Sequence, residues 1–126
     1  MSSYSIKRPR KSKYGNRKVT IVFKGEEVEF DSKKEANRAK ELELMEKAGE
    51  IKALEIQVPY VLIPAFKDKQ GKKHRGAKYI ADFTYYDMAK GDVIIEDVKS
   101  PATRKNAVYR LKKEMMAYQG FEITEV

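Results

Sequence analysis

The chain has 126 residues, with 27 Lys and Arg against 19 Asp and Glu, a formal net charge of +8, one histidine and no cysteine. This length suits about one domain, and the residue counts exclude disulfide frameworks, Cys/His zinc sites and thiol nucleophiles, so any metal site needs oxygen ligands. No stretch approaches the roughly 20 apolar residues of a membrane span, and no apolar signal core follows the N-terminus. We therefore expect a cytoplasmic protein without a membrane partner.

The excess positive charge lies at the N-terminus. Residues 1–25 contain eight Lys and Arg and no Asp or Glu, whereas basic and acidic residues balance in the rest of the chain. We predict a flexible arm over residues 1–17 that binds a polyanion, and a single domain over residues 18–126. A solubilising tail, or a targeting or expression segment, is the alternative. The arm residues expected to contact DNA are Lys7, Arg8, Arg10, Lys11 and Lys13.

The first half of the domain predicts a hairpin, a helix and extended segments. Two β-prone runs end at Phe23 and Phe30 and are separated by Gly25, which indicates a hairpin. Ser32 and Glu35 have the spacing of a capping box, and the apolar residues that follow have helical spacing, so we expect a helix over about 32–48. In "IKALEIQVPYVLIPAF", we expect Pro59 to separate one strand from a second extended piece.

The second half of the domain begins at residues 67–78. Their composition predicts a flexible, basic loop. "YIADFTYY" and "VIIEDVKS" then predict two strands joined by a turn at Gly91. Residues 103–121 predict one helix, and "FEITEV" an edge strand. The apolar stripe expected to face the core along that helix consists of Ala107, Val108, Leu111, Met115 and Tyr118. The order predicts an α/β (α+β) domain, with a mixed sheet flanked by two helices.

Two aspartates and a lysine are embedded in the predicted strands. Strand alternation places Asp97 and Lys99 on one face and Glu96 on the other. If the two strands pair, Asp82 lies about 5 Å from Asp97 across the ladder. Carboxylates this close repel each other, and Mg²⁺ would offset that repulsion with oxygen ligands and substrate phosphate. Lys99 would position a water or neutralise developing charge. An ordinary i, i+2 ion pair is the alternative for Asp97 and Lys99.

The set of acidic and basic positions resembles the PD-(D/E)XK, or restriction-endonuclease-like, nuclease superfamily. The segments "GEIKALEIQVPYVL", "YIADFTYY" and "IIEDVKSPATRKNAVYRLKK" are similar to small phage and prophage nucleases related to Holliday junction resolvases. The resemblance runs from about Phe30 to Tyr118, with Ala81 where the superfamily name has proline. It implies a restriction-endonuclease-like sheet and a Mg²⁺- or Mn²⁺-dependent DNA endonuclease, in the host cytoplasm if a phage encodes it.

The resemblance also implies roles for individual residues. Asp82 and Asp97 would hold the metal, and Lys99 would act in catalysis. Glu35 matches a helix glutamate near the metal, although its capping position is an equal alternative. Gln57 matches a polar strand position near the metal. The alternative is that Gln57 is an ordinary surface glutamine.

Basic side chains outside the arm are expected to bind the DNA backbone. They are Lys72, Lys73, Arg75, Arg104, Lys105 and Lys112. His74 is interpreted as a phosphate contact or a bystander, and Tyr79, Tyr85 and Tyr86 as packing residues. A homodimer is expected, because duplexes and symmetric junctions need two cuts. The rival functions are a non-catalytic DNA-binding module and an RNA-binding protein, the latter lacking an RNP-type aromatic motif.

Overall fold

A computed structural model of the chain describes residues 17–126; the arm residues Lys7, Arg8, Arg10, Lys11 and Lys13 lie outside the described residues. The chain divides into two compact units, Met1–Glu41 and Leu42–Val126. Along residues 17–126, no helix has both the length and the apolar character that a membrane span requires.

The N-terminal unit contains the predicted hairpin. Strands β1 (Val19–Phe23) and β2 (Glu26–Phe30) pair antiparallel. The turn residues Lys24 and Gly25 both have positive φ, 52° and 86°, which matches the twist that a two-residue hairpin turn requires. Phe23 and Phe30 pack edge to face with ring centroids 6.1 Å apart. The hairpin prediction is confirmed.

Helix α1 (Lys33–Lys47) begins in the N-terminal unit and ends in the C-terminal unit. The Ser32 hydroxyl oxygen accepts a hydrogen bond from the Glu35 N–H at 3.1 Å, so Ser32 satisfies one of the free donors of the first turn. After the helix, Gly49 adopts a φ of 81°, the left-handed conformation that commonly ends helices. The predicted helix is confirmed within two residues at each end.

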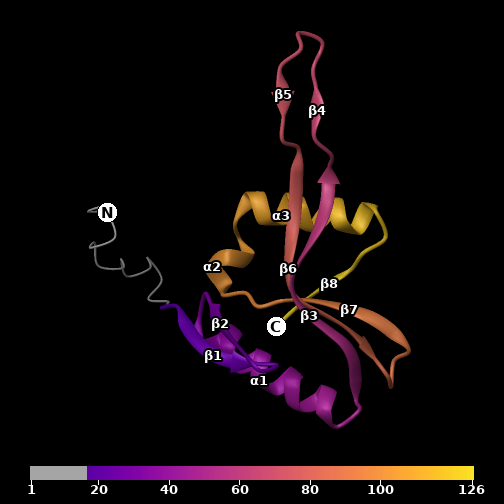
Figure 1. The fold of residues 1–126 in the computed structure, drawn as a ribbon. Coiled ribbons are helices and arrows are strands. Elements are labelled where there is room, and N and C mark those ends of the chain that lie inside the picture. The colour runs from indigo at the N-terminus through magenta and orange to yellow at the C-terminus, as the bar shows by residue number, and fades with distance from the viewer. Residues whose placement is uncertain (1–16) are drawn as a thin grey trace, which may run out of the picture. The chain divides into compact units, whose positions relative to one another are not determined.

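The C-terminal unit is built on a four-stranded mixed sheet of order β3-β6-β7-β8. Its strands are β3 (Ile51–Ile63), β6 (Ala77–Asp87), β7 (Asp92–Asp97) and β8 (Ile123–Glu125). β6 pairs antiparallel with β3 and with β7, whereas β8 pairs parallel with β7. Figure 1 shows the long β3 and β6 side by side, with α3 running across them. The predicted α+β class and mixed sheet are confirmed.

Pro59 does not interrupt the chain as predicted. Strand β3 continues through it, and Pro59 pairs with Ile80 of β6. Because β3 is an edge strand of this sheet, one side of its backbone has no neighbouring strand, and a proline without an N–H is tolerated there. The prediction failed because edge position depends on sheet order, which local sequence does not reveal.

The predicted flexible loop over residues 67–78 is instead a small hairpin. Strands β4 (Phe66–Lys67) and β5 (Lys73–His74) pair antiparallel. The Asp68 carboxylate closes the turn by accepting the N–H groups of Gln70 and Lys72 at 2.9 and 3.0 Å. Figure 1 shows this hairpin projecting from the ends of β3 and β6, away from α3.

The predicted last helix is divided in two. Helix α2 (Pro101–Arg104) follows Ser100, and α3 (Ala107–Tyr118) starts after Asn106, whose side-chain oxygen accepts the Tyr109 N–H at 3.0 Å. An asparagine at this position stabilises the start of a new helix better than the interior of a continuous one.

The buried face of α3 also differs from the prediction. Val108, Leu111 and Tyr118 are 62%, 60% and 92% exposed, and it is Tyr109 and Met116 that are buried. Helix α3 carries apolar side chains on two faces, so periodicity alone did not identify the face that meets the sheet. The core of this unit consists of Leu62, Tyr79, Ala81, Ile95, Tyr109, Met116 and Ile123.

The corrected orientation of α3 predicts different costs for two truncations. Met116→Ala should lower the free energy of unfolding by about 2–5 kcal/mol, because it leaves a cavity at a fully buried site. Leu111→Ala, on the exposed face, should change it by less than about 0.5 kcal/mol. Urea unfolding followed by circular dichroism measures both. A larger loss for Leu111→Ala than for Met116→Ala would contradict the observed orientation.

Candidate metal and catalytic site

Three of the predicted site residues come from three neighbouring strands of the sheet. The pairs Ile56–Phe83 and Val58–Ala81 place Gln57 of β3 opposite Asp82 of β6. The last residues paired between β6 and β7 at this end are Phe83 and Glu96, each one position from an aspartate, Asp82 or Asp97. The two aspartates are therefore near neighbours in the register, and their direct alignment stays a prediction.

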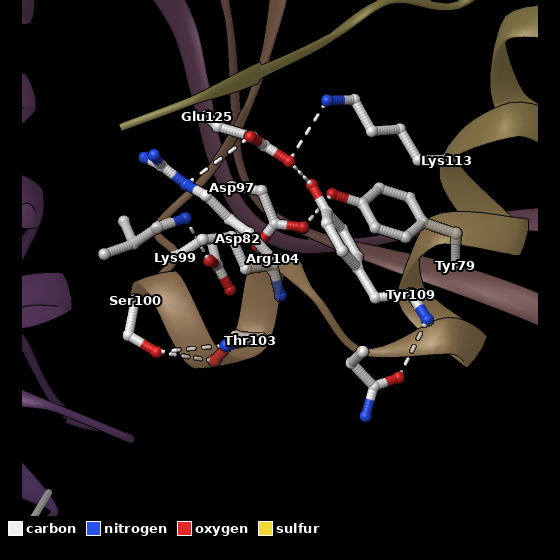
Figure 2. Close-up of polar contacts among 12 residues, drawn as sticks. Tyr79, Asp82, Asp97, Lys99, Ser100, Thr103, Arg104, Tyr109, Lys113 and Glu125 are labelled. Carbon is white, nitrogen blue, oxygen red and sulfur yellow. Dashed lines mark hydrogen bonds and ion pairs between the residues drawn. The ribbon is translucent and has the colours of Figure 1, made fainter. Parts of the chain in front are cut away.

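Asp82 is fixed by the backbone of the neighbouring strand. Its Oδ2 accepts a hydrogen bond from the Val98 N–H at 2.8 Å. Val98 directly follows β7, so this bond joins the Asp82 carboxylate to the chain beside Asp97 (Figure 2). Asp82 is partly exposed, which leaves its carboxylate accessible to an incoming group.

Asp97 is a buried carboxylate with two charged or polar partners. It is 1% exposed. Its Oδ2 accepts the Tyr79 hydroxyl at 2.5 Å, and its Oδ1 lies 3.1 Å from the Lys99 Nζ. Burying an unpaired carboxylate is very costly, and removal of one partner from a buried pair typically costs about 3–5 kcal/mol. Tyr79 and Lys99 thus supply the partners that a carboxylate at this buried position needs.

Lys99 reaches Asp97 from outside the strand. Strand β7 ends at Asp97, so the alternation that predicted a shared strand face does not extend to Lys99. Instead, the Val126 N–H donates to the Asp97 carbonyl at 3.0 Å, and the Lys99 N–H donates to the Val126 carbonyl at 3.1 Å. These bonds hold the segment after β7 extended. The Lys99 Nζ also lies 4.4 Å from the ring centroid of Tyr109, a favourable cation–π contact.

A second carboxylate network, centred on Glu125, adjoins the first (Figure 2). Its Oε2 accepts the Tyr109 hydroxyl at 2.5 Å and lies 3.1 Å from the Lys113 Nζ. Its Oε1 lies 3.5 Å from the Arg104 Nε. Arg104, predicted to bind DNA, is therefore ion-paired within the fold, although its side chain is still partly exposed.

The tyrosines of both networks act as hydrogen-bond donors at neutral pH. Burial, and then the bond to Asp97, raise the pKa of Tyr79 far above its ordinary value. Burial, and then the bond to Glu125, do the same to the pKa of Tyr109. The Tyr109 bond holds the pKa of Glu125 below its ordinary value, and Lys113 adds to this effect. Neither tyrosine is suited to act as a base at neutral pH.

Glu96 belongs to a different environment from Asp97. It is buried, and it accepts a hydrogen bond from the Tyr85 hydroxyl. Its cross-strand partner is Phe83, and residues opposed in this way share a face of the sheet. Glu96 thus lies on the face of Phe83 and Tyr85 and bonds Tyr85, whereas its neighbour Asp97 bonds Tyr79. The two acids have different tyrosine partners, and their division between two faces stays a prediction.

Glu35 and Gln57 have distinct settings. Glu35 belongs to the N-terminal unit, in the first turn of α1, where its N–H bond to Ser32 fits the capping interpretation. Its role as a metal ligand stays a prediction.

Gln57 is exposed and has a φ of 52° in the middle of a strand. For a non-glycine residue this conformation typically costs about 1–3 kcal/mol, and such strain often occurs at functional positions.

The donor set of the C-terminal unit fits a hard divalent cation. Mg²⁺ is usually bound by one or two carboxylates together with waters and substrate phosphates, and Asp82 and Asp97 supply two carboxylates. A carboxylate has roughly four lone-pair sites, so the bonds of Asp97 to Tyr79 and Lys99 leave acceptor capacity. Within residues 17–126, no group of three or more His, Cys, Asp or Glu side chains is placed to hold a metal ion. The fit to a divalent cation therefore rests on Asp82 and Asp97.

The other predicted DNA contacts are distributed over the β4–β5 hairpin, α2 and α3. Lys72, Lys73 and Arg75 are exposed on the β4–β5 hairpin. Lys105 is exposed at the end of α2, and Lys112 is half-buried on α3. His74, the other basic candidate of the hairpin, bonds Asp68 and stacks on Phe66.

Sequence reasoning missed the hydroxyl partners of the acids. Tyr79 was interpreted as a packing residue, which its burial confirms, but its bond to Asp97 was not foreseen. Tyr109 and Glu125 were not singled out at all. The short final strand gave no local signal that it would pair parallel with β7 and bring Glu125 beside Tyr109.

One protein family covers almost the whole chain. Residues 11–125 match the family described as "Protein of unknown function (DUF1064)". The chain belongs to this family. No curated protein and no solved structure matches it. The family match extends from the basic arm to β8 and thus includes Gln57, Asp82, Asp97 and Lys99.

The backbone conformation of Gln57 predicts that glycine is better tolerated there than at a nearby strand position. Gln57→Gly should raise the free energy of unfolding by about 1 kcal/mol, because glycine adopts positive φ without strain. Glu55→Gly, at an exposed position of the same strand, should lower it by about 0.5–1 kcal/mol. Chemical unfolding measures both changes, and destabilisation by Gln57→Gly would contradict the strained conformation.

Proposed function

We propose that this chain is a Mg²⁺- or Mn²⁺-dependent endonuclease that hydrolyses phosphodiester bonds in DNA, with branched DNA such as a four-way junction as its expected substrate. One observation carries the proposal. The Asp82 carboxylate accepts the N–H of Val98, the residue that follows Asp97, and Lys99 contacts Asp97. Neighbouring carboxylates repel each other, which supports a role for the pair beyond folding.

Asp82 and Asp97 are the residues that would hold the cation. When bound there, a divalent cation supplies positive charge to the phosphate and activates water for attack. The protein's own contribution is to orient the two carboxylates before substrate arrives. The Val98 N–H directs Asp82, and the Tyr79 hydroxyl directs Asp97. Such preorganised donors avoid the cost of rearranging the site during the reaction.

Lys99 would stabilise the negative charge that develops on the phosphate. Its Nζ is held between the Asp97 carboxylate and the Tyr109 ring, so its position is defined without substrate. The side chain is 18% exposed, and this partial exposure gives it access to an incoming phosphate. A fixed cation near the reacting group lowers the barrier through charge stabilisation.

Positive side chains around the site support DNA as the substrate. Arg104 and Lys113 contact Glu125 and remain nearly half exposed. Phosphate contacts of such residues give affinity without base sequence preference. The resemblance to the PD-(D/E)XK superfamily supports the same reaction class, as do the basic arm residues. The expected homodimer belongs to this proposal, because it would supply two sites for two strands.

A non-catalytic DNA-binding module is the second candidate, and one observation favours it. Tyr79 and Lys99 already pair the Asp97 carboxylate, and within residues 17–126 no buried side-chain polar atom lacks a hydrogen-bond partner. The cluster would then serve the fold alone. Such a module would bind DNA with the same basic surfaces and would not cleave it.

Cleavage assays with a nearly isosteric variant separate these two functions. The wild-type protein should cleave linear, nicked or four-way DNA with Mg²⁺ or Mn²⁺ and not with EDTA. Asp97→Asn keeps the side-chain shape but removes a metal-binding charge, so cleavage should fall about 100-fold or more while DNA binding in EDTA persists. Gel electrophoresis of labelled DNA measures cleavage, and fluorescence anisotropy measures binding.

Asp92→Asn is the matched control for this experiment. Asp92 is an exposed residue at the opposite end of the same strand, and its Oδ1 accepts the N–H of its neighbour Val93. The control should cleave DNA like the wild type. Absence of cleavage by the wild-type protein on every substrate and metal, with binding intact, would establish the non-catalytic module instead. Full cleavage by Asp97→Asn would overturn the site assignment.

A further inference from the structure

The β4–β5 hairpin is a preformed element and not a loop that needs a ligand to order it. Asp68 organises its turn through the Gln70 and Lys72 N–H groups. The Asp68 N–H donates to the Lys72 carbonyl at 2.9 Å, and Asp68 Oδ2 lies 2.9 Å from His74 Nε2. The bond to His74 is the main reason that the pKa of Asp68 lies below its ordinary value. The one acidic side chain of the hairpin is therefore engaged within it.

Gly76 fixes the base of the hairpin against β3. A Cβ atom at this position would lie 2.0 Å from the Ile63 carbonyl oxygen, and the φ of Gly76 is 77°. Only glycine permits this close approach of two backbones. The hairpin thus leaves the sheet in a defined direction, which Figure 1 shows as a projection beyond the ends of β3 and β6.

The two faces of the hairpin differ in chemistry. Phe66 and His74 are directly paired, and so are Lys67 and Lys73; because neighbouring residues of a strand alternate, these pairs lie on opposite faces. Every basic side chain of the segment is exposed. These side chains are Lys67, Lys69, Lys72, Lys73, Arg75 and Lys78. One face therefore carries the Lys67–Lys73 pair, and the other carries the Phe66–His74 ring pair.

The ring pair is stacked and accessible. The Phe66 and His74 centroids lie 4.7 Å apart with an interplanar angle of 10°. Phe66 is 48% exposed, although an aromatic side chain of this size is usually buried in a fold. A nucleic-acid base stacks on such a ring regardless of its identity, because every base has a π-face. Bases inside a continuous duplex already stack on their neighbours and cannot use this ring.

We propose that the hairpin recognises branched DNA, with its cationic face along the phosphate backbone of a duplex arm and the Phe66–His74 ring pair stacked on an unpaired base beside that arm. This inference rests on the proposed function for the choice of DNA, and it assigns the preference for branched substrate to the hairpin. The metal site would cleave the DNA, and the hairpin would select the positions where unpaired bases adjoin a duplex. Phosphate contacts and base stacking thus come from opposite faces of one rigid element.

The test measures binding in EDTA, so that cleavage does not enter the readout. Full-length wild-type protein and Phe66→Ala are titrated into a splayed-arm DNA with unpaired bases at the branch and into a continuous duplex of the same length. Phe66→Ala should weaken splayed-arm binding about tenfold, because one base-stacking contact is lost, and leave duplex binding unchanged. A 2-aminopurine base at the branch should show fluorescence quenching with wild type and little with the variant.

Two further variants serve as controls for the Phe66→Ala measurement. Tyr118→Ala removes a 92% exposed aromatic ring from α3 and should bind both DNAs like the wild type. Lys73→Ala should weaken binding to both DNAs alike and reduce the salt dependence by about one phosphate contact. If Phe66→Ala weakens both DNAs equally, or neither, the proposal is overturned. Absence of cleavage by the wild-type protein on every substrate and metal, with splayed-arm preference intact, would instead overturn only the nuclease.

Discussion

The C-terminal unit is organised around the buried carboxyl group of Asp97. It is nearly inaccessible to water, so the fold must supply its partners, and it does so with the Tyr79 hydroxyl and the Lys99 ammonium. Lys99 in turn lies over the Tyr109 ring, and Tyr109 bonds Glu125. Strand β6, helix α3 and strand β8 thus each contribute a side chain to one connected polar network. Partly satisfied buried networks are costly, whereas fully satisfied ones fix a unique arrangement.

This network explains features that hydrophobic packing alone does not. Helix α3 turns Tyr109 inward and leaves Leu111 exposed, because only the tyrosine side chain both fills the core and bonds Glu125. Strand β8 is short, yet its parallel pairing brings Glu125 to Lys113 and Arg104. The sheet register places Gln57 opposite Asp82. The proposed metal site and the structural network share Asp97.

Local signals in the sequence predicted the β1–β2 hairpin, helix α1 and the pairing of β6 with β7, because turn residues, caps and alternation act over few residues. The register of β6 against β7 was predictable for the same reason, since a short turn fixes it. Three features were not predictable. Pro59 is tolerated because β3 is an edge strand, the α3 face is chosen by Tyr109, and Glu125 arrives through a long-range parallel pairing. Each depends on tertiary neighbours that no short window of sequence contains.

The proposed pairing of Asp82 and Asp97 around one divalent cation can be tested by Mn²⁺ titration of the ¹⁵N-labelled protein without DNA. Paramagnetic broadening of amide signals depends on distance from the ion and requires no catalysis. Substoichiometric Mn²⁺ should broaden the amides of Asp82, Asp97 and Val98 first, and Asp82→Asn should remove this selectivity. Broadening centred on other residues, or none at concentrations that support cleavage, would contradict a metal site at this pair.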